Sequence, residues 1–180
     1  MVKVFAFLYF ESINFYMKKF IAALTIIFSL ATGATAIALQ TQESEILFAA
    51  ENLFLQMKDK NYQKIWDNLT SKTKKSIIED VYKVSRKMKI DVKKEDLAND
   101  FAFSGPHARA YWDSYLSVFD PDTVLKECVW SMGKIKGNAA EINVLHKNSE
   151  RPAVLKLYKE DNAWKLGLEE SFGARKLNPF

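Results

Sequence analysis

The sequence predicts an α+β domain in which helices come first along the chain and an antiparallel sheet comes last. Between about residues 42 and 119, apolar residues recur at three- and four-residue spacing, which is typical of amphipathic helices. From Thr123 the apolar period becomes two, and turn residues separate short segments. Helices and strands that occupy separate parts of a chain are typical of α+β domains.

The first part of the chain divides into separate helical segments. One helix is expected over 42–58, with Thr41 as its N-cap. A second helical stretch is expected over 62–88, with an interruption near 69–71. The residues that follow, 89–103, are charged and poorly periodic, and they predict a loop or a short helix.

A third helix is expected to begin at Pro106. Proline suits the first helical position because its missing N–H would have no partner there. The helix is expected to end at 120–122, where the sequence reads Asp-Pro-Asp. One face of this helix is aromatic, and it carries Tyr111, Trp112, Tyr115, Leu116 and Phe119.

The last part of the chain predicts a curved four-stranded antiparallel sheet, with the helices packed on it in a cone-like arrangement. The strands are expected at about 123–132, 140–147, 153–159 and 164–169. The Gly137-Asn138 pair predicts a tight hairpin turn. Cys128 shares its strand register with Trp130 and Met132, so we expect a buried thiol without a functional role.

The N-terminal 36 residues have the pattern of a cleavable signal peptide. After Met17, Lys18 and Lys19 give a positive segment, residues 20–30 are apolar, and Ala34–Ala36 offers small residues to a signal peptidase. The expected products are a leader over 1–36 and a single mature domain over 37–180. The expected location of the mature domain is periplasmic or secreted.

Two alternatives to this reading stay open. Residues 20–39 carry no charge and are long enough to span a bilayer, so an uncleaved leader would anchor the domain to a membrane. That leader is the only membrane contact that we expect. Residues 1–16 place a second apolar patch before the positive segment, and they are interpreted as an upstream misassignment of a start at Met17.

Composition excludes several function classes. The chain has 26 basic and 22 acidic residues; the leader holds three Lys and one Glu, which leaves 23 and 21, a net charge near +2. A net charge this small does not indicate a nucleic-acid partner. A single cysteine excludes an internal disulfide, and the two histidines show no metal-ligand spacing. Without a glycine-rich phosphate loop either, we expect no metal and no cofactor.

The order of elements resembles small exported members of the nuclear-transport-factor-2-like superfamily, which includes SnoaL-like, cystatin-like cone folds. The resemblance rests on the opening helix around 49–54, the segment 58–62, the segment 65–70, and above all the closing hairpin 154–166. It implies helices packed on a curved sheet, often around a pocket, and it does not imply one chemistry. The charged segment 71–94 departs from the compact members.

Aromatic residues and one histidine are the candidates for a ligand pocket. These candidates are Trp66, Tyr111, Tyr115, Trp130 and His146. Acid–base catalysis in such a cone would need a buried carboxylate, and the candidates for it are Asp67, Asp113 and Glu127. We interpret these three as solvated, so no catalytic residue is predicted.

The favoured function is that of an exported non-catalytic domain that binds a small apolar or amphipathic ligand, or a partner protein. One alternative is a periplasmic phospholipid carrier, suggested by export and by the basic stretch between Lys72 and Lys94. A second alternative is an isomerase- or hydratase-like enzyme that uses Asp67 or Asp113. The sequence leaves the oligomeric state open, a dimer included.

We predict that the mature protein begins at Ile37. Signal peptidase cleaves after a small residue, and Ala36 supplies it. Intact-mass measurement of the exported protein checks this, and a membrane-bound product that keeps the leader would contradict it.

Overall fold

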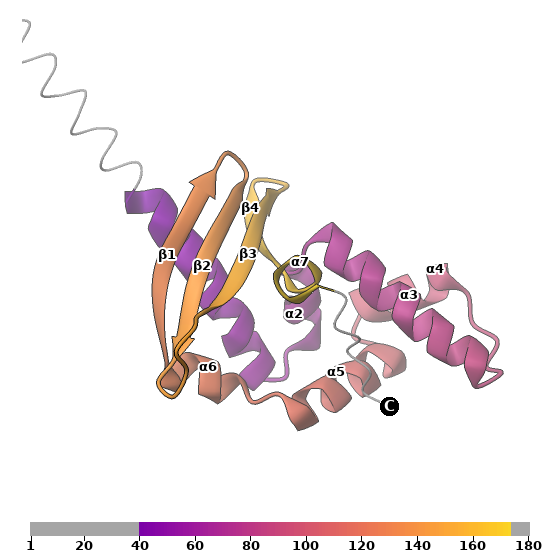
Figure 1. Cartoon of the computed structure of the whole chain (residues 1–180). Coiled ribbons are helices and arrows are strands. Elements are labelled where there is room, and N and C mark those ends of the chain that lie inside the picture. Colours follow the sequence, from indigo (N-terminus) through magenta and orange to yellow (C-terminus); the bar gives the residue numbers. More distant parts are fainter. Residues whose placement is uncertain (1–39, 174–180) are drawn as a thin grey trace, which may run out of the picture. The chain divides into compact units, whose positions relative to one another are not determined.

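The computed structural model describes residues 40–173 (Figure 1). Contacts divide the chain into a first unit, residues 1–43, and a compact unit, residues 44–180. Only residues 40–43 of the first unit are described, and they are helical. The predicted signal peptide and the predicted start at Met17 lie outside the described residues.

The compact unit has an α+β fold, which confirms the predicted fold class. The first helix covers residues 40–58. The helices that follow are α2 (Tyr62–Asp67), α3 (Ser71–Lys87), α4 (Lys94–Ala102), α5 (Pro106–Val118), α6 (Pro121–Glu127) and, after the sheet, α7 (Leu168–Phe172). The strands are β1 (Cys128–Lys136), β2 (Ala139–His146), β3 (Ala153–Glu160) and β4 (Ala163–Gly167).

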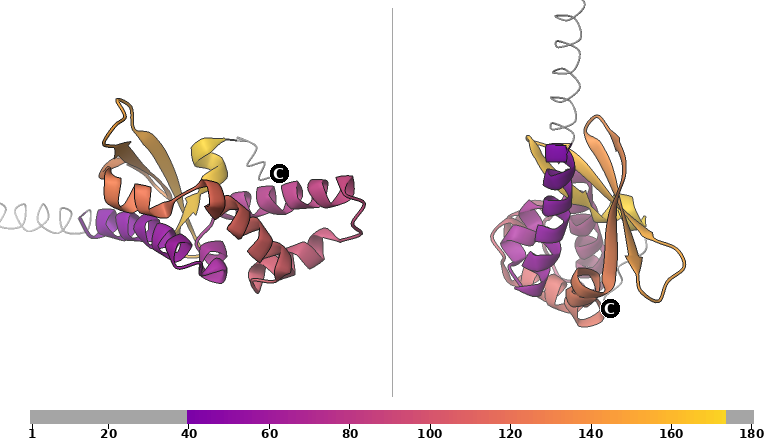
Figure 2. Two further views of the ribbon diagram at one scale, coloured as in Figure 1. Left: turned by 90° about the horizontal axis from the view of Figure 1, so that it is seen from below. Right: turned by 90° about the vertical axis from the view of Figure 1, so that its left-hand side faces the viewer.

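The four strands form an antiparallel sheet in the order β1-β2-β3-β4, as predicted. Gly137 has φ +57° in the first hairpin, and Asp161 and Asn162 have φ 51° and 62° in the last. Left-handed residues in two-residue turns match the right-handed twist of the flanking strands. The sheet is curled but not closed, and Figure 2 shows it curving over the first helix.

One face of the curled sheet carries the core. Along β2 and β3, buried side chains alternate with more exposed ones, as expected for a sheet with one covered face. The first helix packs against the covered face, where Phe54 meets Trp130 of β1 edge-on. The largest fully buried side chains come from the first helix, α4, α5 and the sheet, and they include Trp112, Phe101, Leu53, Met57, Ile142, Leu157 and Leu166.

Three expectations about element boundaries were wrong. Residues 121–127 form α6 instead of the start of a strand, because Pro121 occupies the first helical turn and the Asp120 side chain accepts a hydrogen bond from the Asp122 N–H. Leu168 begins α7 instead of ending β4. Thr41 lies inside the first helix and is not its N-cap.

The segment 68–70 joins the helices to the sheet. Leu166 N donates to Asn68 O at 2.9 Å, and Thr70 N donates to Leu166 O at 3.1 Å. This segment therefore lies beside β4 in a short parallel bridge. It is the interruption between α2 and α3 that the sequence predicted near 69–71.

Two glutamates from the sheet side bind the N-terminus of α3. Glu160 accepts hydrogen bonds from the Ser71 N–H and hydroxyl at 2.9 and 2.7 Å. Glu170 of α7 accepts from the hydroxyls of Thr70 and Thr73, each at 3.0 Å. A helix N-terminus favours negative charge, and α3 has no acidic residue in its own first turn. Gly167 leaves the space beside Glu170 free, since a Cβ there would lie 2.6 Å from Glu170 Oε2.

Helix α5 begins at a cap supplied by a distant residue. The Asp100 carboxylate of α4 accepts a hydrogen bond from the Ala108 N–H at 2.7 Å and a longer one from the His107 N–H. Gly105 precedes the helix, and a Cβ there would lie 2.2 Å from Asp100 Oδ2. The glycine therefore lets the carboxylate reach the free N–H groups of α5, whose aromatic face forms part of the site described below.

We predict that Trp164→Ala lowers the free energy of unfolding by about 3–5 kcal/mol. Trp164 is 5% exposed in β4 and belongs to the core cluster. Lys165 lies on the opposite face of the strand, so Lys165→Ala should cost under about 0.5 kcal/mol. Denaturant unfolding of both variants measures this contrast. Equal losses would mean that the register of β4 is different from the one described.

Candidate functional site

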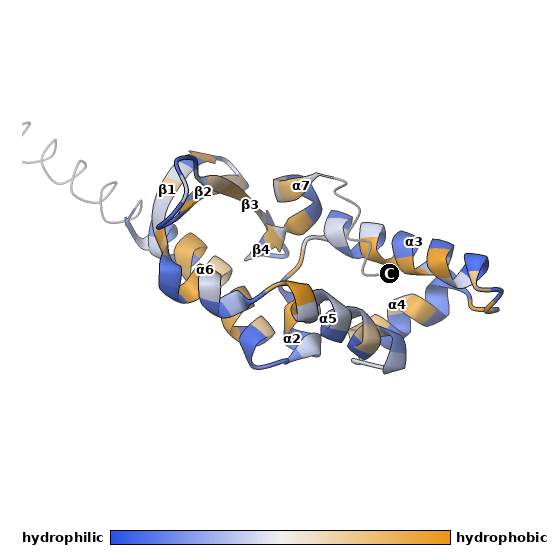
Figure 3. Cartoon of the chain, turned by 60° about the horizontal axis from the view of Figure 1, so that its bottom comes forward, coloured by the Kyte–Doolittle hydropathy of each residue, from blue (hydrophilic) through white to orange (hydrophobic). Residues whose placement is uncertain are grey.

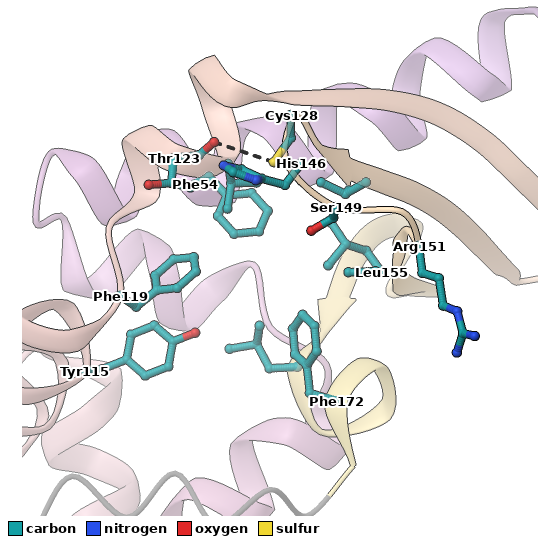
Figure 4. A pocket seen from close by; sticks show the side chains of 14 residues that line it. Phe54, Tyr115, Phe119, Thr123, Cys128, His146, Ser149, Arg151, Leu155 and Phe172 are labelled. Atoms are coloured by element: carbon teal, nitrogen blue, oxygen red, sulfur yellow. Dashed lines mark hydrogen bonds between the residues drawn. The ribbon is translucent and has the colours of Figure 1, made fainter.

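A mainly apolar cavity of about 290 Å³ opens between the inner face of the sheet, the first helix and α7 (Figure 4). We call it the sheet pocket. Phe54 comes from the first helix, Val144 and Leu155 from the sheet, and Leu168 from α7. The cavity exists because side chains do not fill the space between the curled sheet and the short helix α7.

A second cavity of about 540 Å³ lies between α3, α5 and α7, and we call it the helix pocket. Ile77 of α3 and Tyr111 of α5 belong to this pocket alone. Four residues line both cavities, and they are Tyr115, Phe119, Leu168 and Phe172. The two pockets are therefore neighbours that share an apolar and aromatic wall.

The shared wall is held by a series of ring contacts. Tyr115 packs edge-on against Trp112, with ring centroids 5.7 Å apart, and against Phe119 at 5.3 Å. Phe119 contacts Phe54, which meets Trp130 edge-on at 5.7 Å. Edge-to-face aromatic pairs contribute about 0.5–1.5 kcal/mol beyond their buried area. The Tyr115 ring is thus held by a series of ring contacts that extends from α5 to β1.

Two largely buried tyrosines line these pockets, and their hydroxyl oxygens are accessible from the cavities. Tyr111 and Tyr115 are 6% and 9% exposed, and neither hydroxyl bonds to any other residue within 40–173. Burial raises the pKa of Tyr115 to about 12, and burial, Tyr115 and Asp80 together raise the pKa of Tyr111. Both hydroxyls are therefore protonated at neutral pH. Figure 4 shows the Tyr115 hydroxyl directed into the cavity.

Polar side chains lie at the edge of the sheet pocket. His146 Nδ1 accepts a hydrogen bond from the Asn148 N–H at 3.2 Å, which leaves its Nε2 facing Glu127 at 3.4 Å. Lys147 pairs with the same glutamate at 2.8 Å. Lys147, and to a smaller extent His146, hold the pKa of Glu127 below its usual range. Arg151 is exposed at this edge, and it has no acidic partner among the described residues.

The helix pocket has an acidic edge. Glu79, Asp80 and Glu169 line it, together with the single basic residue Lys83. Lys83 lies 3.8 Å from Glu79 and 3.9 Å from Asp80, so its charge is shared between them. The two pockets thus differ in the charged residues at their openings.

The structure brings together only some of the predicted ligand-binding residues. Tyr115 and His146 line the sheet pocket, and Tyr111 joins Tyr115 in the helix pocket. Trp66 lies apart, in a shallow groove where the Lys74 ammonium is 5.6 Å from its ring centre. Trp130 lines none of these three cavities; its indole N–H donates to Val124 O at 3.0 Å.

The expectation of a buried Cys128 was wrong. The thiol is half-buried and lines the sheet pocket, with its sulfur 3.5 Å from Thr123 O. Burial, and to a smaller extent Glu127, raise the pKa of this thiol. The difference arises because α6 ends immediately before Cys128, which makes this residue the first of β1, paired with His146 at the end of the strand.

Sequence reasoning did not single out Phe54, Phe119, Phe172 and Arg151 as pocket residues. Phe54 belongs to the apolar face of the helix predicted over 42–58, and Phe119 belongs to the aromatic face of the helix predicted from Pro106. Both patterns are typical of residues in a hydrophobic core. The signal that could have found the three phenylalanines is the number of large aromatic residues in the sequence, because a small sheet cannot cover all of them.

None of the three candidate catalytic carboxylates lines a cavity described above. Asp67 and Asp113 are exposed, and neither lines the three pockets described above. Asp113 pairs with Lys60 at 3.1 Å and accepts a hydrogen bond from the Tyr62 hydroxyl. Those two bonds hold the pKa of Asp113 below its usual range. Glu127 is engaged by Lys147 and His146.

Among residues 40–173, no cluster of histidine, cysteine or acidic side chains could hold a metal ion. Within the same described part, no helix has both the length and the hydropathy needed to cross a bilayer. No protein-family model, curated protein or solved structure matches this chain. The resemblance to the nuclear-transport-factor-2-like superfamily therefore stays a prediction.

We predict that Tyr115→Phe changes the free energy of unfolding by less than about 0.5 kcal/mol, because the hydroxyl that it removes has no partner to lose. Thermal or denaturant unfolding of the ligand-free chain measures the change. In contrast, Tyr62→Phe breaks the hydrogen bond to Asp113 and should be destabilising. A clear loss of stability in Tyr115→Phe would show that the hydroxyl is structurally bonded.

Proposed function

We propose that this domain is an exported, non-catalytic carrier of a small amphipathic molecule, whose apolar part occupies the sheet pocket and extends along the shared wall. The observation that carries the proposal is the Tyr115 hydroxyl, which is directed into an apolar cavity and has no hydrogen-bond partner in the described part of the chain. Export rests on the leader predicted for residues 1–36.

The energetics of the hydroxyl support a ligand. The Tyr115 hydroxyl oxygen is accessible from the cavity and has no acceptor among residues 40–173. A ligand oxygen that accepts from it would gain one hydrogen bond, worth about 0.5–1.5 kcal/mol. Tyr111 lines the adjoining cavity in the same unbonded state, which favours a ligand with hydrogen-bonding groups over a pure hydrocarbon.

The cavity sizes support a small molecule. Small-molecule pockets in proteins span roughly 300–1,000 Å³, and cavities of about 290 and 540 Å³ lie at the low end and the middle of that range. A diacyl phospholipid would have to fill both pockets at once. The basic stretch that suggested a phospholipid carrier is partly neutralised, because Lys83 and Lys94 both pair with Glu79.

An isomerase- or hydratase-like reaction has no geometric support. Such chemistry needs a carboxylate in an apolar site, where burial raises its pKa toward neutrality. Asp67 and Asp113 are both exposed, and the ion pair of Asp113 moves its pKa in the opposite direction. Binding, in contrast, needs only the apolar walls and the free hydroxyls.

We predict that the purified full-length chain binds prodan, a neutral naphthalene ketone whose emission shifts to the blue in apolar sites. Tyr115→Phe should weaken this binding about three- to tenfold, the value of one hydrogen bond to the ketone oxygen. The control is Tyr158→Phe, the same change on the outer face of β3, which should leave the affinity unchanged. Fluorescence titration measures both variants.

A second pair of variants tests the location of the probe. Ala153 lines the sheet pocket at the start of β3, and Val154 beside it points to the other face of the sheet. Ala153→Trp should fill the cavity and abolish saturable binding, whereas Val154→Trp should not. Equal binding by all four variants, or no binding by the wild-type chain, would contradict the proposal.

A further inference from the structure

The two openings of the cavity pair differ in their charged residues. At the opening of the sheet pocket, Glu127 pairs with Lys147 and faces His146, whereas Arg151 has no acidic partner among residues 40–173. At the opening of the helix pocket, Glu79, Asp80 and Glu169 face Lys83, and Lys94 also pairs with Glu79, which leaves one acidic group in excess. A charged ligand would therefore enter the two openings with different electrostatic energies.

Arg151 is placed where a ligand head would leave the apolar cavity. It lies in the loop between β2 and β3, near Ser149 and two residues before Ala153, all of which line the pocket. Figure 4 shows its guanidinium extending outward from the cavity wall. An arginine keeps its stem on apolar surface and its charge in water, which suits a headgroup at the edge of a pocket.

The acidic residue nearest to Arg151 in the sequence is not paired with it. Glu150 precedes it in the loop and is exposed, but it makes no ion pair with Arg151 and does not line the pocket. The guanidinium thus keeps its donors free for a planar anion, and a carboxylate matches them in a two-bond arrangement.

We propose that the ligand of the sheet pocket is an anionic single-chain amphiphile, with its carboxylate at Arg151 and its chain running past Tyr115 along the shared wall. This inference rests on the proposed binding function and adds the class of ligand and its direction in the site. A cationic amphiphile is disfavoured by Arg151, and the acidic helix-pocket opening repels a carboxylate from the other end.

The test compares cis-parinaric acid with its methyl ester, because the two have the same fluorescent chain and differ only in the charge of the head. With the full-length chain at pH 8 and low salt, Arg151→Gln should weaken binding of the acid about fivefold, the value of one partly exposed charge pair. Binding of the ester should not change. Salt should weaken acid binding by the wild type and have little effect on the variant.

Arg86→Gln is the matched control, because it removes the same charge from the exposed end of α3, away from both pockets. It should leave the affinity for the acid unchanged. Equal weakening of acid and ester by Arg151→Gln, or of the acid by both variants, would overturn the proposal. Co-extracted diacyl phospholipid in native mass spectrometry would also overturn it. If prodan binds and these results fail, the binding function stands and only the anionic ligand is wrong.

Discussion

The attachment of α3 to the sheet is the constraint on which the rest of the structure depends. The backbone bridge between Leu69 and Leu166 fixes where the helix begins, and the carboxylates of Glu160 and Glu170 hold its first turn. Because Glu170 belongs to α7, the same bonds place Leu168 and Phe172 opposite α5. The walls of both pockets therefore derive from one junction between the helical and the sheet halves of the domain.

The second fixed point is the aromatic face of α5. Its helical spacing puts Tyr111 and Tyr115 one turn apart, and Trp112 and Phe119 lock the second ring in place. A rigid ring that carries an unbonded hydroxyl is a preorganised binding element, since little side-chain entropy remains to be lost on binding. The domain thus combines a stable aromatic core with a polar group that the core itself does not use.

The sequence predicted the α+β class, the strand order and the breaks around α3, because periodicity and turn residues are local signals. It did not predict α6. The alternating apolar pattern that includes Val124 indicated a strand, but Pro121 in the first turn and the Asp120 cap favour a helix there. Among site residues, Tyr115 and His146 were found because they are conspicuous types on a predicted apolar face. Arg151 and Phe172 were not, because their roles follow from the curl of the sheet and the position of α7, which depend on distant contacts.

Gly167 and Glu170 illustrate how such a junction limits the way in which the sequence can change. A methyl group at 167 would displace the carboxylate from Thr70 and Thr73, whose hydroxyls are enclosed and would lose their acceptor. A shorter side chain at 170 would remove the same acceptor from both hydroxyls. Neither position can vary alone without a loss, so in divergent sequences with this fold the two should be replaced together or kept together. Such paired variation would mark the fold even where overall similarity is lost.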